Sequence, residues 1–178
     1  MKSDRTQIAH LFRRAGFGAT PEELDDLTEQ KSYEEIVDEL VNPEKCEHID
    51  DSFVDRYYSG EGVPPYVGKW LFKMVNTKRP LEEKMALFLH HIFPVAWGKS
   101  EHGPSIFTEI DMFKRVGLTN FKNILLELSR DPAMIYWLDN NENHKSEINE
   151  NYGRELLELF SMGVGNYTED DIKNASRA

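Results

Sequence analysis

Apolar residues recur along most of this chain at intervals of three and four positions, the spacing that places them on one face of an α-helix. The stretch TQIAHLFRRAG is an example, with Ile8, Leu11 and Phe12 on one face. No alternation of polar and apolar residues, the mark of a half-buried strand, continues beyond four positions. The pattern predicts an all-α fold: a single domain over residues 1–178, built as an irregular multi-helix bundle of about ten helices without a substantial sheet. The predicted helices cover residues 6–16, 19–27, 31–41, 66–76, 80–93, 105–117, 120–130, 130–138, 150–163 and 166–178.

Helix start signals support several of these segments. Thr20 and Glu23 have the spacing of a capping box, in which each side chain bonds the other residue's backbone N–H, and Ser32 and Glu35 repeat it. Asp131 precedes a proline, which suits the first position of a helix. These local signals predict where three of the helices begin.

Two segments depart from the helical pattern. Residues 43–65 mix helix breakers with a short aromatic patch, and they predict a long loop with one helical turn around Phe53–Tyr58. At the other end, the last predicted helix reaches Ala178 without a C-capping residue. We therefore expect the chain to be the N-terminal part of a longer protein.

Composition narrows the possible partners. The chain has 32 acidic and 21 basic residues, a formal charge of −11, which argues against a nucleic-acid partner and favours acidity that serves solubility. No run approaches the roughly 20 apolar residues of a membrane span, and the N-terminus lacks the apolar stretch of a signal peptide. A cytoplasmic location is the default expectation. Cys46 is the only cysteine, so an internal disulfide is excluded.

Two adjacent histidines near the end of the apolar segment 80–93 are candidates for chemistry. Neighbouring residues on a helix diverge by about 100°, so His90 and His91 cannot easily converge on one metal ion. Zinc-binding helices instead space their histidines at i and i+4. His90 is interpreted first as a structural hydrogen-bonding histidine, because a buried imidazole needs partners for its nitrogens. Acid–base and metal roles are the alternatives.

The polar loop DNNENHKSEINE resembles a calcium-binding loop between helices. Loop positions 1, 3, 5, 9 and 12 carry oxygen donors, and calcium prefers six to eight such ligands. His144 occupies the position where the pattern requires glycine. A calcium site and a solvated linker therefore both remain open. The candidate ligands are Asp139, Asn141, Asn143, Glu147 and Glu150.

The helix over 150–163 is rich in carboxylates. Its predicted buried stripe consists of Tyr152, Leu156, Leu159 and Phe160, with Glu155 at the edge. A carboxylate at the edge of a core needs cationic or amide partners, or its pKa rises. Glu155 is interpreted as part of a structural ion pair or, alternatively, of an acid–base site. The candidate partners are His90, Arg13, Arg14, Asn149 and Asn151.

Four ordered blocks, HLFRRAGFGATPEEL, PLEEKMALFLHHIF, RDPAMIYWLDNNEN and NENYGRELLELFSMGVGNYTEDDI, resemble the bacterial domain-of-unknown-function family 1800 (DUF1800). The resemblance runs from about His10 to the end of the chain, and it implies a mostly helical fold in longer proteins. It brings no settled activity. The chain departs from the family pattern at Ile92, where a second histidine is typical, and at His91, where asparagine is usual. The matching positions are His10, Arg13, Arg14, Gly16, Gly18, His90, Phe93, Asn149, Glu150, Asn151, Arg154 and Glu155.

Two hypotheses about function follow. The first is a structural or interaction module of a larger, envelope-associated protein, with a protein partner. It is favoured because the chain contains no GxSxG, HExxH, CxxC or phosphate-binding glycine-rich motif. The alternative is a hydrolase-like or metal-dependent enzyme, since imidazole, carboxylate and guanidinium groups together can perform acid–base chemistry. Its tentative catalytic residues are His90, Glu155, Asn149, Arg13 and Arg14.

Overall fold

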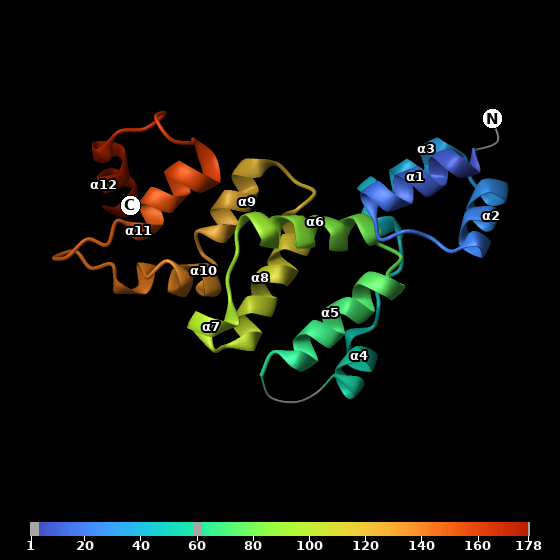
Figure 1. Ribbon diagram of the computed structural model, residues 1–178, viewed down its shortest axis with the longest axis horizontal. Coiled ribbons are helices and arrows are strands. Elements are labelled where there is room, and N and C mark those ends of the chain that lie inside the picture. Colours follow the sequence, from blue (N-terminus) through green and yellow to red (C-terminus); the bar gives the residue numbers. More distant parts are fainter. Residues whose placement is uncertain (1–3, 59–61, 178) are drawn as a thin grey trace.

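The computed structural model describes residues 4–58 and 62–177, and this part of the chain forms twelve α-helices and no strand (Figure 1). The predicted all-α fold is confirmed. An isolated bridge between His144 and Glu147 is the sole β-type pairing among the described residues. The helices are α1 Arg5–Ala15, α2 Pro21–Gln30, α3 Tyr33–Val41, α4 Asp51–Tyr57, α5 Pro64–Asn76, α6 Pro80–Ile92, α7 Trp97–Ser100, α8 Gly103–Val116, α9 Phe121–Leu128, α10 Pro132–Trp137, α11 Asn151–Glu155 and α12 Glu169–Arg177. Three further elements accompany them: 3₁₀ turns η1 Pro43–Lys45 and η2 Asn140–Glu142, and a π-helical segment η3 Leu156–Ser161 that continues α11.

The helices are arranged along one long axis of the molecule (Figure 1). Helices α1, α2 and α3 form one end of the molecule, and α11 and α12 form the other. Helix α6 lies between the two ends and packs along α8. Helix α5 lies beside α6, and α4 packs against α5. Segments far apart in sequence are therefore also far apart in space at the two ends.

The buried apolar side chains form two clusters. The main core is built around Phe93, with ring centroids 6.0 Å from Phe113 and 5.0 Å from Phe160, and it continues through Leu128 and Met134. The N-terminal cluster joins α1, α2 and α3, and Leu81 of α6 packs against it. Helix α6 therefore contributes to both clusters. The buried members of the N-terminal cluster are Ile8, Leu24, Ile36 and Leu40.

The predicted helix starts are formed as expected. The backbone N–H of Glu23 donates to Thr20 Oγ1 at 3.2 Å, and the backbone N–H of Thr20 donates to the Glu23 carboxylate at 2.8 Å. Ser32 and Glu35 make the same reciprocal pair. Asp131 accepts from the backbone N–H of Met134 at 2.9 Å. Each bond satisfies a donor that the first helical turn leaves without a partner.

The segment 43–65 is more helical than expected. It contains η1, the two-turn helix α4 and the start of α5, although residues 59–61 lie outside the described part. Asp50 caps α4, since its carboxylate accepts from the backbone N–H of Ser52 at 2.9 Å. The sequence interpretation missed that cap. The expectation of an uncapped helix end at Ala178 also falls outside the described residues.

The predicted buried stripe of 150–163 is only partly present. Tyr152 and Phe160 are buried, but Leu159 is 66 % exposed. The expectation for Leu159 was wrong because η3 is π-helical, and the wider turn of a π-helix rotates later side chains away from the α-helical stripe.

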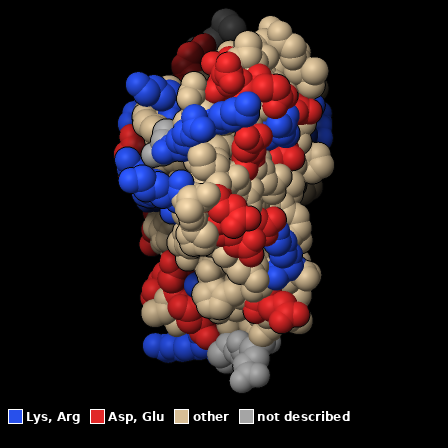
Figure 2. All heavy atoms as spheres, turned by 90° about the vertical axis from the view of Figure 1, so that its left-hand side faces the viewer, with Lys and Arg blue, Asp and Glu red and all other residues tan. Residues whose placement is uncertain are grey.

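Charges are mixed at the end formed by α11 and α12. Figure 2 looks onto this end, where acidic and basic side chains are interspersed and no broad basic face forms. Arg154 pairs there with both Glu150 and Glu169. Within residues 4–58 and 62–177, no helix has the length and hydrophobicity needed to cross a bilayer.

Candidate functional site

His90 has a buried carboxylate as its partner. It lies in the last turn of α6, and its Nδ1 is 3.1 Å from Glu109 Oε2 on the facing helix α8. The Glu109 side chain is completely buried, whereas the His90 side chain is 23 % exposed. The edge of the Trp70 ring system contacts the imidazole, with centroids 5.9 Å apart. Glu109 is thus the hydrogen-bond partner that the structural interpretation of His90 requires.

Burial controls the protonation of this pair. Removal from water raises the pKa of Glu109 from 4.5 to about 7, against the lowering effect of the hydrogen bond with His90. The negative charge of Asp131, itself buried, raises it further. Oε1 of Glu109 is buried and has no hydrogen-bond partner among the described residues. A protonated Glu109 avoids placing an uncompensated charge in the core.

A second buried carboxylate, Glu83, lies on α6, two turns before His90. Glu83 accepts from the indole N–H of Trp70 at 2.9 Å and pairs with Lys114 Nζ at 3.1 Å. Trp70 therefore contacts one buried carboxylate directly, through its hydrogen bond to Glu83, and also packs against the ring of His90, the partner of Glu109. These polar groups join three helices and fix their relative positions.

Glu109 was not among the residues singled out from the sequence, but a signal for it exists. It shares a helical face with Ile106, Ile110 and Phe113, at spacings of three and four residues. A lone carboxylate on an apolar stripe is rarely buried without a partner. Its partner His90 is 19 positions earlier, a distance in sequence that no helical periodicity connects.

The fold does not bring the five predicted catalytic residues together. Arg13 and Arg14 are exposed near the end of α1, at one end of the long axis. Asn149 and Glu155 lie just before and within α11, at the opposite end (Figure 1). Glu155 makes no hydrogen bond or ion pair with His90, Asn149 or either arginine within the described residues. The acid–base role of these five residues stays a prediction, and the structure places the arginines and the residues near α11 apart.

Asn149 instead stabilises the loop that precedes α11 through hydrogen bonds. Its amide donates to the backbone oxygen of Asp139 at 3.0 Å, and its backbone N–H donates to Asn143 Oδ1 at 3.1 Å. The Asn143 amide donates to the backbone oxygen of Ser176 in α12 at 2.7 Å. Asn151 donates to the backbone oxygen of Leu138 at 3.0 Å. The asparagines thus satisfy backbone groups of a non-helical segment.

The five candidate calcium ligands are partly engaged by protein donors. Lys99 Nζ lies 2.5 Å from Asp139 Oδ1, and Arg154 lies 3.4 Å from the Glu150 carboxylate. The left-handed residue of the loop is Asp139, with φ of 58°, rather than His144. No group of three or more histidine, cysteine or acidic side chains suited to a metal ion occurs in the described residues. Calcium binding by Asp139, Asn141, Asn143, Glu147 and Glu150 stays a prediction, which a calcium titration of the melting temperature tests.

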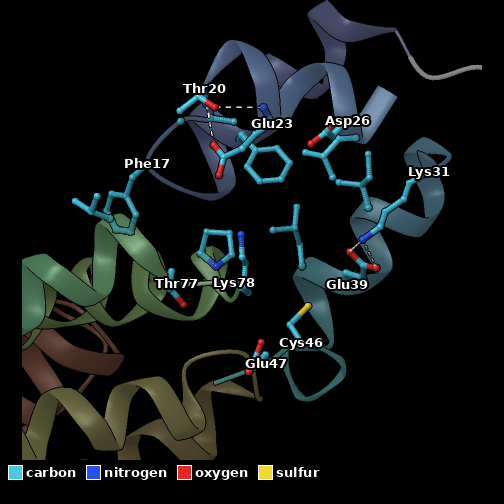
Figure 3. A pocket seen from close by; sticks show the side chains of 18 of the residues that line it. Phe17, Thr20, Glu23, Asp26, Lys31, Glu39, Cys46, Glu47, Thr77 and Lys78 are labelled. Carbon is cyan, nitrogen blue, oxygen red and sulfur yellow. Dashed lines mark hydrogen bonds and ion pairs between the residues drawn. The ribbon is translucent and has the colours of Figure 1, made fainter. Parts of the chain in front are cut away.

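An open cleft of about 800 Å³ lies beside the N-terminal cluster (Figure 3). Helices α2 and α3 and the segment after η1 form its outer walls, and the end of α5 with the following turn forms the inner wall. We call it the N-terminal cleft. Its apolar lining includes Phe12, Leu27, Ile36, Leu40, Met74 and Val75.

The rim of the N-terminal cleft combines exposed apolar and charged side chains. Val75 is 80 % exposed and Phe17 is 40 % exposed. Lys31 and Glu39 form an ion pair at 2.6 Å across one wall (Figure 3). Burial raises the pKa of the Cys46 thiol, which keeps it neutral at the opposite wall. The sequence interpretation missed this cleft, because its walls come from segments that are separate in the sequence.

The comparison with protein families fits this helical architecture. Residues 10–178 match the family described as protein of unknown function (DUF1800). The chain belongs to the DUF1800 family. The resemblance seen in the four sequence blocks is therefore confirmed over nearly the whole chain. No curated protein and no solved structure matches this DUF1800 chain.

Proposed function

We propose that this DUF1800 chain is a protein-interaction module and that the N-terminal cleft binds a segment of a partner protein. The main observation in support of this proposal is an open cleft of about 800 Å³ with an apolar lining and a strongly exposed Val75 at its rim. Apolar side chains exposed beside a concave apolar surface are typical of sites that bury a partner. An association of the parent protein with the cell envelope stays a prediction.

The burial and geometry of the His90–Glu109 pair favour a structural role for these two residues over a catalytic one. Glu109 is fully buried, so its carboxyl group cannot touch a substrate in this conformation. The ring nitrogen of His90 that faces the core is already held by Glu109. Both groups stabilise the α6–α8 contact, which in turn supports the inner wall of the cleft through α5 and α6.

An unbiased peptide selection tests the proposal. A displayed library of random segments is panned on the full chain, and the selected segments are then measured against Val75→Glu. We expect the selected segments to bind the unchanged chain and to bind Val75→Glu at least about tenfold more weakly, since burying a charge at the apolar rim of the cleft is costly.

Val164→Glu is the matched control. Val164 is 76 % exposed, close to the exposure of Val75, and lies between η3 and α12 at the other end of the molecule. It should bind like the unchanged chain. Selection of no segment, or equal losses in Val75→Glu and Val164→Glu, would overturn the proposed function.

A further inference from the structure

The negative charge of the chain is concentrated around the N-terminal cleft. Residues 20–50 contain twelve Asp and Glu residues and two lysines, a formal charge of −10 out of −11 for the whole chain. These residues form α2, α3, η1 and the segment that leads to α4. The rest of the chain is almost neutral. A concentration of negative charge at one end of a protein attracts positively charged partners to that end.

Several of these carboxylates border the N-terminal cleft directly. Asp26 on α2 and Glu47 after η1 line opposite walls, and neither forms an ion pair within residues 4–58 and 62–177 (Figure 3). Three lysines also line the cleft. Lys31 pairs with Glu39 and Lys45 pairs with Asp38, which leaves Lys78 on the inner wall. The outer walls therefore present net negative charge to an occupant.

We infer that the partner segment is basic and amphipathic, with apolar side chains on one face and Lys or Arg on its flanks. The inference rests on the proposed function and adds the chemistry of the occupant. The apolar face would bury against Phe12, Met74 and Val75, while the basic flanks would lie beside Asp26 and Glu47. A basic amphipathic helix laid into an apolar groove is a common recognition mode. An acidic segment would meet repulsion from both outer walls.

A pair of designed peptides tests this inference. One is an amphipathic helix of leucine and lysine, and the other has glutamate at each lysine position. Both are labelled and titrated with the full chain by fluorescence anisotropy. We expect the basic peptide to bind, the acidic peptide to bind at least about tenfold more weakly, and the affinity of the basic peptide to fall as salt is added.

Charge-neutral variants locate the effect. The double change Asp26→Asn and Glu47→Gln should weaken the basic peptide by roughly three- to tenfold, because two rim charges are lost. The matched control, Asp170→Asn with Glu142→Gln, removes the same charge at the far end of the molecule, where both residues are exposed. It should leave binding unchanged. Circular dichroism checks that both double variants keep the helical fold.

The outcomes separate this inference from the proposed function. If Val75→Glu abolishes binding while basic and acidic peptides bind equally, the cleft is an interaction site but the inference about charge is overturned. If both double variants weaken the basic peptide equally, attraction is non-specific and the inference is also overturned. If the basic peptide binds Val75→Glu as tightly as the unchanged chain, the cleft is not the site and both proposals fail.

Discussion

At the scale of single residues, the His90–Glu109 pair shows how a buried acid can be accommodated in a helical core. Glu109 is fully buried and shares a hydrogen bond with His90, but its second oxygen has no partner in the described residues. Ionisation would leave a charge in a low-dielectric region. The burial-raised pKa of about 7 is the expression of this cost.

Glu109→Gln should change how stability depends on pH. Between 4.5 and about 7, the folded protein holds a proton that the unfolded chain has released. Stability therefore falls as pH rises through this window and levels off above the folded-state pKa. Gln has no proton to release and keeps a hydrogen-bonding group beside His90. We expect the melting temperature of the unchanged protein to fall between about pH 5 and about pH 7, and that of Glu109→Gln to stay flatter.

Glu142→Gln, a change at an exposed carboxylate, serves as the control and should follow the unchanged protein. A Glu109→Gln curve that falls as steeply as the control would show that the burial of Glu109 is not the source of the pH dependence.

At the scale of elements, the contact between α11 and α12 depends on a glycine. A Cβ atom on Gly153 would meet Ser176 Oγ and would lie 3.1 Å from the backbone oxygen of Ile172 and 3.2 Å from the backbone nitrogen of Ser176. Two of these neighbours are backbone atoms, which cannot rotate away. The close approach also lets the Asn143 amide reach the Ser176 carbonyl. A small side chain here sets the distance between two helices.

Gly153→Ala should destabilise the protein. The added methyl group forces α12 away from α11, and overpacking of this kind costs about 1–3 kcal/mol. Gly98→Ala is the matched control, because Gly98 lies in α7 and its Cβ would have no heavy atom within 4 Å. Alanine there should be neutral or slightly stabilising, since it lowers the entropy of the unfolded chain. Urea unfolding measures both changes, and equal effects would contradict the packing argument.

At the scale of the whole molecule, two hydrophobic clusters share one helix. The N-terminal cluster is small and surrounded by like charges, whereas the main core extends from α6 to η3. Helix α6 connects them, with Leu81 in one cluster and Leu89 in the other. Small clusters open more readily than large ones. The end that carries the cleft is therefore expected to open before the rest of the molecule.

Ile36→Ala should accelerate this local opening. The change removes a fully buried side chain from the N-terminal cluster and costs about 2–5 kcal/mol. Hydrogen exchange should speed up in α1, α2 and α3, while protection of α8 stays unchanged. Added salt should slow the exchange of these three helices, because it screens the repulsion between their carboxylates.

Ile110→Ala, at an equally buried isoleucine of the main core, is the control. It should reduce protection throughout the chain. If Ile36→Ala also lowers the protection of α8 to the same extent, the two clusters unfold as one unit.

Much of the helical architecture was predictable from the sequence, but the candidate site was not. The capping boxes at Thr20 and Ser32 were predicted and are formed. The predicted structural role of His90 needed a partner, and Glu155 was the candidate carboxylate where the fold supplies Glu109. The register of 156–161 was also missed, because a π-helix differs from an α-helix by a hydrogen-bond shift that composition does not reveal.

The sequence by itself determined the all-α class, most helix positions and the excess of acid near the N-terminus. These properties depend on residues within about one helical turn of one another or on simple counting. The tertiary structure decided which distant groups meet: Glu109 with His90, Asn143 with Ser176, and the separate segments that enclose the N-terminal cleft. It also placed α1, which carries Arg13, and α11, which carries Glu155, at opposite ends of the molecule. Such contacts depend on how the helices pack against one another, and many packings are compatible with the same local helical pattern.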